Sequence, residues 1–312
     1  MADRATEVVR SAPDQRLLLR IADITASLTS DGSCNLGVDR EKGKFVVAEG
    51  LPDVSIKTYV GSLPEFSVDN RLFDAGIVWQ LHMHRGSYLF SFRSIAFGSR
   101  PYKIAVFDPD FSRGEVYLHP DFSGRGQPVD PLWSPLDELM FGSILARGKG
   151  AEIHACGLID PQGRGSLFVG ASGAGKTTMA RLWRHRPGSV ILSDDRIILR
   201  RSGGEVWMYG TPWHGEGGMA AAAGVPLTRI FFLRKGSKNA LVPVCGIHAA
   251  SRLFACSFPP IYDREGVDFT LKFLGEVVQE VPCHELSVVP DERVVEFVEK
   301  IVPVQAESRR MP

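Results

Sequence analysis

The sequence predicts an α/β (α+β) domain in the second half of the chain and a separate β-rich domain before it. Strand-like and helix-like segments mix from about residue 150 onward, which is typical of a sheet flanked by helices. Within this half, an apolar strand leads into a glycine-rich loop and then a helix. Before residue 127, short alternating runs are separated by Gly, Pro, Asp and Ser, which indicates strands and turns.

Composition excludes several classes of function. The chain has 312 residues and is 44% hydrophobic, enough to bury a sizeable core and form two domains. Its 36 Lys and Arg balance 36 Asp and Glu, so no overall basic field favours nucleic acid or a membrane surface. No apolar run approaches the ~18 residues of a membrane span, and the N-terminus has no signal-peptide pattern. Because the five cysteines lack a C-x-x-C pair, we expect reduced thiols in a cytoplasmic protein.

The first half is expected to form a β-rich module over residues 16–127, after a flexible polar tail at 1–15. Its clearest strands are Lys44–Val47, Ile77–Met83, Tyr88–Phe92 and Tyr102–Phe107. The dipeptide Arg85-Gly86 between two of these runs indicates a hairpin. His82 and His84 have the spacing of metal ligands, but no third ligand is evident, so we expect no metal there.

The second domain is expected to cover residues 128–305, with a C-terminal tail at 306–312. It begins with a helix that Ser134 caps, with Pro135 in its first turn and Gly148 past its end. Short apolar runs then predict strands at Ile153–Leu158, Ser166–Val169, Val190–Leu192, Ile197–Leu199, Val206–Tyr209, Ile230–Leu233 and Glu285–Val288. Helical spacing predicts helices after Lys176, at Asp268–Glu280 and at Asp291–Ile301.

The segment Gly170–Thr177 reads GASGAGKT and fits the phosphate-loop pattern G-x-x-x-x-G-K-[ST]. Its glycines let successive backbone N–H groups turn around a phosphate, and the next helix directs its positive end at the same anion. Lys176 supplies a cation for the β- and γ-phosphates, and the Thr177 hydroxyl is placed to ligate Mg²⁺. The expected nucleotide contacts are Gly170, Ala171, Ser172, Gly173, Ala174, Gly175, Lys176, Thr177 and Thr178. We therefore predict a site for a nucleoside triphosphate.

Two acids, Asp194 and Asp195, follow the next apolar strand. A carboxylate at such a strand end can hold Mg²⁺ on the phosphates. Neighbouring residues of a strand point to opposite sides, so the two acids are expected to differ in role. One can hold the metal while the other accepts a proton from an attacking hydroxyl. The alternative is a pair of solvated turn acids.

Two further segments carry candidate site residues. His154 lies on the strand before the phosphate-loop strand, where an imidazole near the γ-phosphate can shuttle a proton; the alternative is a core histidine. The glycine-rich loop 210–218 contains Trp213, His214 and Glu216. Such a loop can close over substrate, with Glu216 on the metal and His214 on phosphate. The alternative is a structural turn.

These motifs resemble the catalytic domain of HPr kinase/phosphorylase. Ile153–Gly157, Gly170–Thr178 and Leu192–Ile197 are similar to that family's His-Gly strand, its G-x-S-G-x-G-K-[ST] loop and its acid-pair strand end, in the same order. The same core resembles phosphoenolpyruvate carboxykinase, and the likeness covers about residues 150–235. Val206–Gly215 departs from the family's L-E-I-R-G-x-G signature and is closer to HPr-kinase-like proteins of peptide-modification systems.

The resemblance implies a phosphoenolpyruvate-carboxykinase-like P-loop fold and transfer of the γ-phosphoryl of ATP to a serine hydroxyl. It implies His154 as the active-site histidine, Asp194 as general base, and Asp195 as a metal-binding acid beside Thr177. Lys176 would stabilise charge on the transferred group. The resembled family forms hexamers, so a homo-oligomer is possible.

We therefore expect an ATP- and Mg²⁺-dependent serine kinase that acts on a peptide, a protein or a small molecule. One alternative is carboxykinase-like transfer to a small acid. Another is a nucleotide-binding regulatory or interaction protein without turnover. No nucleic-acid or membrane partner is expected.

Overall fold

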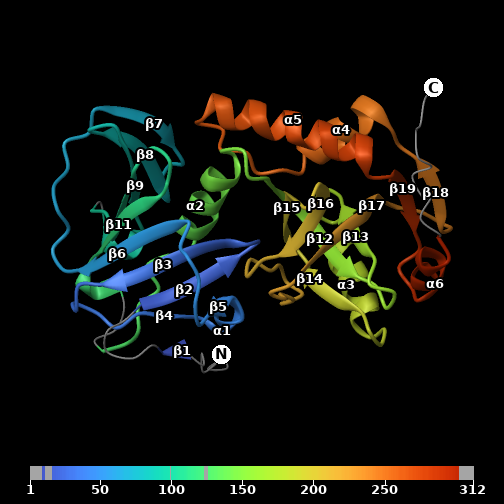
Figure 1. The fold of residues 1–312 in the computed structure, drawn as a ribbon, viewed down its shortest axis with the longest axis horizontal. Coiled ribbons are helices and arrows are strands. Elements are labelled where there is room, and N and C mark those ends of the chain that lie inside the picture. The colour runs from blue at the N-terminus through green and yellow to red at the C-terminus, as the bar shows by residue number, and fades with distance from the viewer. Residues whose placement is uncertain (1–8, 11–15, 99, 123–125, 302–312) are drawn as a thin grey trace. The chain divides into compact units, whose positions relative to one another are not determined.

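The structure, a computed structural model, describes residues 9–10, 16–98, 100–122 and 126–301 (Figure 1). The tails expected at 1–15 and 306–312 lie outside these residues, apart from the short strand β1 (Val9–Arg10). Over the described residues the fold is mixed α/β, with two large sheets and six α-helices. None of the helices in this part of the chain is long and apolar enough to cross a membrane.

The chain divides into two compact units, Met1–Ile144 and Leu145–Pro312. We expected the division at 127/128, before the helix α2 (Leu136–Leu145), whereas the boundary between the units falls in the chain between Ile144 and Leu145, at the end of that helix. The predicted end of this helix at Gly148 lies past its observed end, because residues 146–149 form turns.

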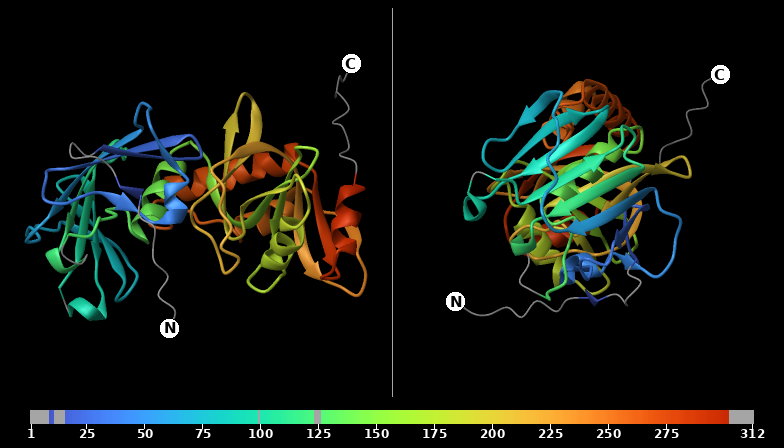
Figure 2. Two further views of the ribbon diagram at one scale, coloured as in Figure 1. Left: turned by 90° about the horizontal axis from the view of Figure 1, so that it is seen from below. Right: turned by 90° about the vertical axis from the view of Figure 1, so that its left-hand side faces the viewer.

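The first unit is built on a nine-stranded sheet within the described residues, blue to green in Figures 1 and 2. Its strands, in spatial order, are β5 (Val46–Val47), β2 (Arg16–Ile21), β3 (Ile24–Ser30), β6 (Val54–Val60), β11 (Arg113–Leu118), β10 (Lys103–Phe107), β9 (Ser87–Phe92), β8 (Trp79–His84) and β7 (Asn70–Asp74). The smaller elements are β4 (Gly37–Val38), which pairs with β1, the helix α1 (Arg40–Gly43), and the 3₁₀ turns η1 (Ile95–Phe97) and η2 (Pro120–Phe122). The predicted hairpin is present, with His84 paired to Ser87 across the Arg85-Gly86 turn.

One face of this sheet forms an aromatic core. Phe90, Phe92 and Phe107 are fully buried, as is Leu81 on the neighbouring strand β8. In β9, Leu89 and Ser91 alternate with Phe90 and Phe92 and therefore point to the opposite face. The two faces of the sheet thus differ in chemistry.

The second unit has an eight-stranded sheet among the described residues, in the order β13-β12-β15-β16-β17-β19-β18, with β14 also paired to β12. Its strands are β12 (Ala151–Ile159), β13 (Gly165–Val169), β14 (Val190–Ser193), β15 (Arg196–Ser202), β16 (Glu205–Gly210), β17 (Gly224–Lys235), β18 (Ala240–Pro243) and β19 (Cys283–Val288). Because β13 pairs with both β12 and β17, five of these strands close into a ring.

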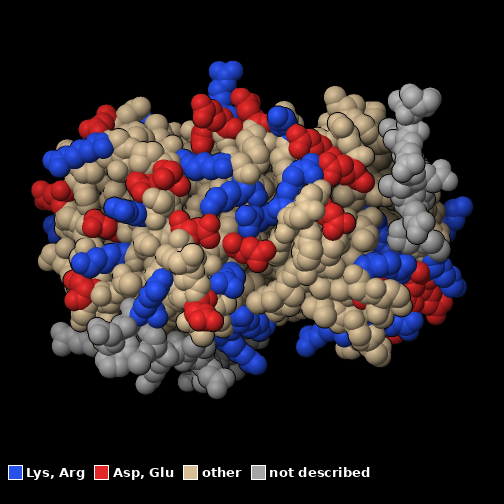
Figure 3. Space-filling model, in the orientation of Figure 1, with Lys and Arg blue, Asp and Glu red and all other residues tan. Residues whose placement is uncertain are grey.

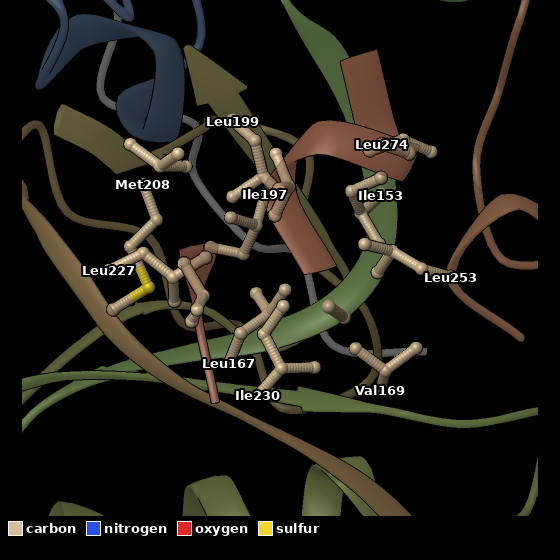
Figure 4. Close-up of a cluster of buried hydrophobic side chains, with 14 of the residues drawn as sticks. Ile153, Leu167, Val169, Ile197, Leu199, Met208, Leu227, Ile230, Leu253 and Leu274 are labelled. Carbon is tan, nitrogen blue, oxygen red and sulfur yellow. The ribbon is translucent and has the colours of Figure 1, made fainter. Parts of the chain in front are cut away.

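Four helices cover this sheet: α3 (Lys176–Arg184), α4 (Gly246–Phe254), α5 (Arg264–Glu280) and α6 (Arg293–Glu299). Leu253 of α4 and Leu274 of α5 join a buried cluster with Leu167 and Val169 of β13 (Figure 4). Phe168 lies between these two and points to the opposite face. There it joins a second buried cluster, which α3 and α6 complete with Met179, Trp183, Val294 and Val298. The strand β13, which leads into the glycine-rich loop, is therefore packed against helices on both of its faces.

Candidate functional site

The predicted phosphate loop, the glycine-rich segment at Gly170–Thr177, follows the buried strand β13 and runs into α3. Gly175 caps the helix with φ 112°, a left-handed conformation in which a residue with a Cβ is strained. Ala171, Ser172 and Gly173 are exposed. The loop therefore presents backbone and the positive end of α3 to solvent, as an anion site requires.

The ammonium group of Lys176 lies inside this loop. Its Nζ donates to the carbonyl oxygens of Gly170, at 2.7 Å, and of Ala171, at 3.2 Å. Burial lowers the pKa of Lys176, and the negative charge of Asp195 opposes that shift. Thr177 and Thr178 follow in the first turn of α3 and are half-buried.

His154 and Asp195 meet because β12 pairs with two strands at once. Gly157 of β12 lies opposite Ser193 at the end of β14, and His154 lies opposite Arg196 at the start of β15. The intervening residue Asp195 is thereby held next to β12, and its Oδ1 is 3.1 Å from Nε2 of His154. Both side chains are 28% exposed.

The hydrogen bond from His154 lowers the pKa of Asp195 below its ordinary value. Burial works against this shift, while the positive charges of Arg196 and Lys176 add to it. Asp195 is therefore a carboxylate at neutral pH that is still partly open to solvent and within electrostatic range of the phosphate-loop lysine.

Asp194 points elsewhere. Its side chain is buried, and its oxygens accept backbone N–H groups from Gly215 at 3.1 Å, Gly217 at 2.8 Å and Met219 at 3.4 Å. A Cβ at Gly217 would lie 2.4 Å from Oδ2 of Asp194, so glycine is required for this close approach. Asp194 therefore anchors the glycine-rich loop 210–218.

Other residues of that loop are spread between core and surface. Trp213 is buried, and its carbonyl oxygen accepts from Oγ of Ser193 at 3.1 Å. His214 and Glu216 are exposed, and Nδ1 of His214 lies 3.0 Å from the Gly215 carbonyl oxygen. Among the described residues, no hydrogen bond or ion pair joins His214 or Glu216 to the phosphate loop or to Asp195. Their substrate roles stay predictions.

Arg196 belongs to the site although sequence reasoning gave it no role. Its guanidinium contacts the carboxylate of Asp195, lies 3.2 Å from Oε1 of Glu152, and stacks 4.2 Å from the ring centroid of Phe258. Its position directly after the acid pair was a usable signal, because a cation there faces the same carboxylate. Phe258 is distant in sequence, and no local signal pointed to it.

Thr177 and Asp195 carry the hydroxyl and the carboxylate that the sequence predicts as Mg²⁺ ligands, and this role stays a prediction. Over the part of the chain that the structure describes, no three His, Cys, Asp or Glu side chains gather into a metal site of their own. A hydroxyl and one carboxylate fit the way Mg²⁺ binds with a nucleotide, because phosphate oxygens and water then complete its octahedral shell.

Comparisons with known proteins do not identify a function for this site. No protein-family model matches the chain, and no curated protein matches it. A solved structure of the Hpr(Ser) kinase/phosphatase from Coxiella burnetii matches with a TM-score of 0.29 and 13% identity, covering 47% of this chain and 93% of that one. We therefore infer function from the site itself.

Proposed function

We propose that the unit Leu145–Pro312 binds MgATP at Gly170–Thr178 and transfers its γ-phosphoryl group to a serine-type hydroxyl. The acceptor is a peptide, a protein or a small molecule. The proposal includes a phosphoenolpyruvate-carboxykinase-like P-loop fold and kinship with HPr-kinase-related serine kinases. It is supported by the order of elements around the loop, strand β13, glycine loop and helix α3.

One observation carries the proposal beyond nucleotide binding. The His154–Asp195 pair, joined at 3.1 Å, stands within electrostatic range of Lys176 in the phosphate loop. Holding a triphosphate requires only the loop and its cation. An ionised carboxylate paired with an imidazole adds the means to take a proton from an attacking hydroxyl.

In the proposed reaction the loop amides and Lys176 hold the phosphates, and Lys176 exchanges its contact with the Gly170 carbonyl for phosphate oxygens. Thr177 would help to hold Mg²⁺, which would neutralise phosphate charge when bound. The acceptor oxygen forms a bond to the γ-phosphorus while the bond to the β–γ bridging oxygen breaks, so ADP leaves. The acceptor's proton passes to the His154–Asp195 pair.

Asp194 and Asp195 have different proposed roles because their surroundings differ. The resemblance predicts Asp194 as base, but the oxygens of Asp194 accept three backbone N–H groups. The side chain of Asp194 is also only 1% exposed, so its oxygens are occupied by the loop and are not open to an acceptor hydroxyl. We propose that Asp195 accepts the proton of the attacking hydroxyl and that Asp194 fixes the position of the loop 210–218.

Turnover separates this proposal from its alternatives. The chain is incubated with MgATP and, in separate reactions, serine-containing peptides, small alcohols or small carboxylic acids, and ADP release and product mass are measured. A gain of 80 Da (roughly one phosphoryl group) on a hydroxyl acceptor is expected, and it disappears in Lys176→Ala. Turnover only with acids would favour carboxykinase-like chemistry, and ATP binding without turnover a regulatory protein.

A further inference from the structure

A cavity of about 1020 Å³ lies over one face of the sheet in the first unit. Its floor is the face opposite the aromatic core. Gln80 of β8 pairs with Ser91 of β9, His82 pairs with Leu89, and Ser91 in turn pairs with Ile104 of β10. Directly paired residues share a face, so these five side chains form one continuous floor. Phe66, from the segment 62–68, and Phe97, from the segment 96–98, line its walls.

Two polar atoms of this floor have no hydrogen-bond partner in the described part of the protein. Nδ1 of His82 and Nε of Arg93 are withdrawn from solvent, and neither has a hydrogen-bond partner among the described residues. No acid lies within ion-pair distance of Arg93 in this part of the chain. A shielded polar atom without a partner is costly, and one that belongs to a charged guanidinium more so, because nothing replaces the lost water. A ligand that supplies acceptor oxygens removes that cost.

The acids that line the cavity do not reach Arg93. Asp121 is 84% exposed and lies 3.7 Å from His119, and Glu65 is also exposed. Both are therefore at the rim. Burial, together with the charges of Arg71 and Arg93, lowers the pKa of His82, so its imidazole is neutral at pH 7. The charge that remains on the floor is the positive charge of Arg93.

We propose that this cavity binds an organic anion, with a carboxylate or phosphate group at Arg93 and His82 and an apolar body against Leu89, Ile104 and Phe97. The guanidinium offers the paired donors that match both anionic groups. The volume is at the upper end of the range for small-molecule sites, so a ring-sized body fits beside the charge. This proposal is independent of the phosphotransfer proposed for the second unit.

The test is calorimetric titration of the full chain with benzoate, phenyl phosphate and, as a neutral probe of the same size, benzyl alcohol. We expect one or both anions to bind and the alcohol to bind at least tenfold more weakly. Binding of benzoate alone assigns a carboxylate ligand, and binding of phenyl phosphate alone assigns a phosphate ligand. If neither anion binds, the proposal is overturned.

Variants locate the binding. Arg93→Gln is expected to raise the Kd of the bound anion about tenfold or more, since one charge-assisted contact is lost. Arg113→Gln, which removes an exposed arginine of β11 that does not line the cavity, serves as the matched control and should leave the Kd unchanged. Lys176→Ala should also leave it unchanged, whereas a loss there would place the anion at the phosphate loop and refute the proposal.

Folding of Arg93→Gln is checked by its circular-dichroism spectrum, which should match the wild type, and by a cooperative thermal unfolding transition. If that variant does not fold, His82→Asn replaces it as the test, with an expected weakening in the same direction. A wild-type Kd in the folded variant would contradict the site. Failure of phosphotransfer would leave this result untouched, because the two readouts use different ligands and different residues.

Discussion

At the scale of single residues, the neighbouring acids Asp194 and Asp195 occupy opposite environments. Asp194 is 1% exposed and surrounded by backbone N–H groups, whereas Asp195 is 28% exposed and faces His154. The chain turns between β14 and β15 at this point, so adjacent side chains are directed to different parts of the site. Of the two carboxylates, only that of Asp195 is open to solvent, which is why the proposed mechanism gives it the proton.

Replacing Asp195 with Asn should lower the rate of phosphotransfer about 100-fold or more, because the amide cannot accept the proton. The Kd for ATP should stay within about threefold, since the phosphates rest on the loop and Lys176. Initial rates and calorimetry measure the two quantities. Glu205→Gln, an exposed acid on β16, is the control. Full turnover by the Asn variant would rule out Asp195 as the proton acceptor.

The same pair gives a pH dependence. The pKa of Asp195 is lowered in the folded chain, first by the His154 hydrogen bond, so the folded state is favoured above the ordinary carboxyl pKa. This contribution is lost as the pH falls through the lowered value. The stability difference between wild type and His154→Asn should therefore be present above the ordinary carboxyl pKa and shrink as the pH falls below it, as urea unfolding at several pH values would measure. A difference that grows below that pKa would contradict the pairing.

At the scale of elements, the loop 210–218 depends on glycine at its contact with Asp194. A Cβ at Gly217 would lie 2.4 Å from Oδ2 and 2.9 Å from Cγ of that buried side chain. The loop and the acid strand are therefore packed without spare room, and their positions are coupled.

Gly217→Ala should destabilise the fold by about 1–3 kcal/mol, because either the loop or Asp194 must move. Phosphotransfer should fall as well, since Asp194 directly precedes Asp195. Gly275→Ala in the helix α5 is the control: no atom lies within 4 Å of its added Cβ. Helix propensity predicts that this control is neutral or about 0.5–1 kcal/mol more stable. Denaturant unfolding compares the two, and equal stability of both variants would refute the contact.

Across the whole molecule, acidic and basic side chains are interspersed on the face shown in Figure 3. In the first unit, by contrast, several charged side chains are buried. Lys42 lies 2.7 Å from Asp130 and 2.8 Å from Asp137, and both contacts are buried. Lys103 is also fully buried, with its Nζ donating to the Trp133 carbonyl oxygen and lying 4.5 Å from the Phe92 ring centroid.

Burial lowers the pKa of Lys103 to about 7, although Asp137 and Asp130 oppose the shift. An unfolded lysine titrates near ~10.4, so between these values the unfolded chain binds one more proton and stability rises with pH. Replacing Lys103 with Met should abolish that rise. Below pH 7 it should stabilise the protein by a few kcal/mol, on the order of 1.4 for each pKa unit.

Urea unfolding of the wild type and the Met variant from pH 6 to about 10 measures this effect. Lys57→Met serves as the control, because Lys57 is exposed on β6 of the same sheet. Parallel pH curves for wild type and Lys103→Met would show that the buried amine is charged throughout.

Local chemistry explains how much of the fold could be predicted. The phosphate loop was recognised because strand, glycines, Lys176 and helix follow one another within one stretch of chain, and hydrogen bonds of that stretch close locally. Alternating apolar residues predicted the hairpin at Arg85-Gly86. The helix α4 was missed, because Ala249 and Leu253 alone are buried on it and its glycine start is a weak helix signal.

The sequence by itself determined a nucleotide-type loop, an acid pair beyond it and a mixed α/β fold, since each depends on residues close together in the chain. Tertiary structure alone decided that His154 pairs with Asp195, that Asp194 holds the glycine loop, and that Arg196 joins the site. Strand pairing between β12 and β15 brings these groups together across some forty residues of chain. No local pattern encodes which face of a paired strand meets which neighbour, so the partners appear only when the sheet is formed.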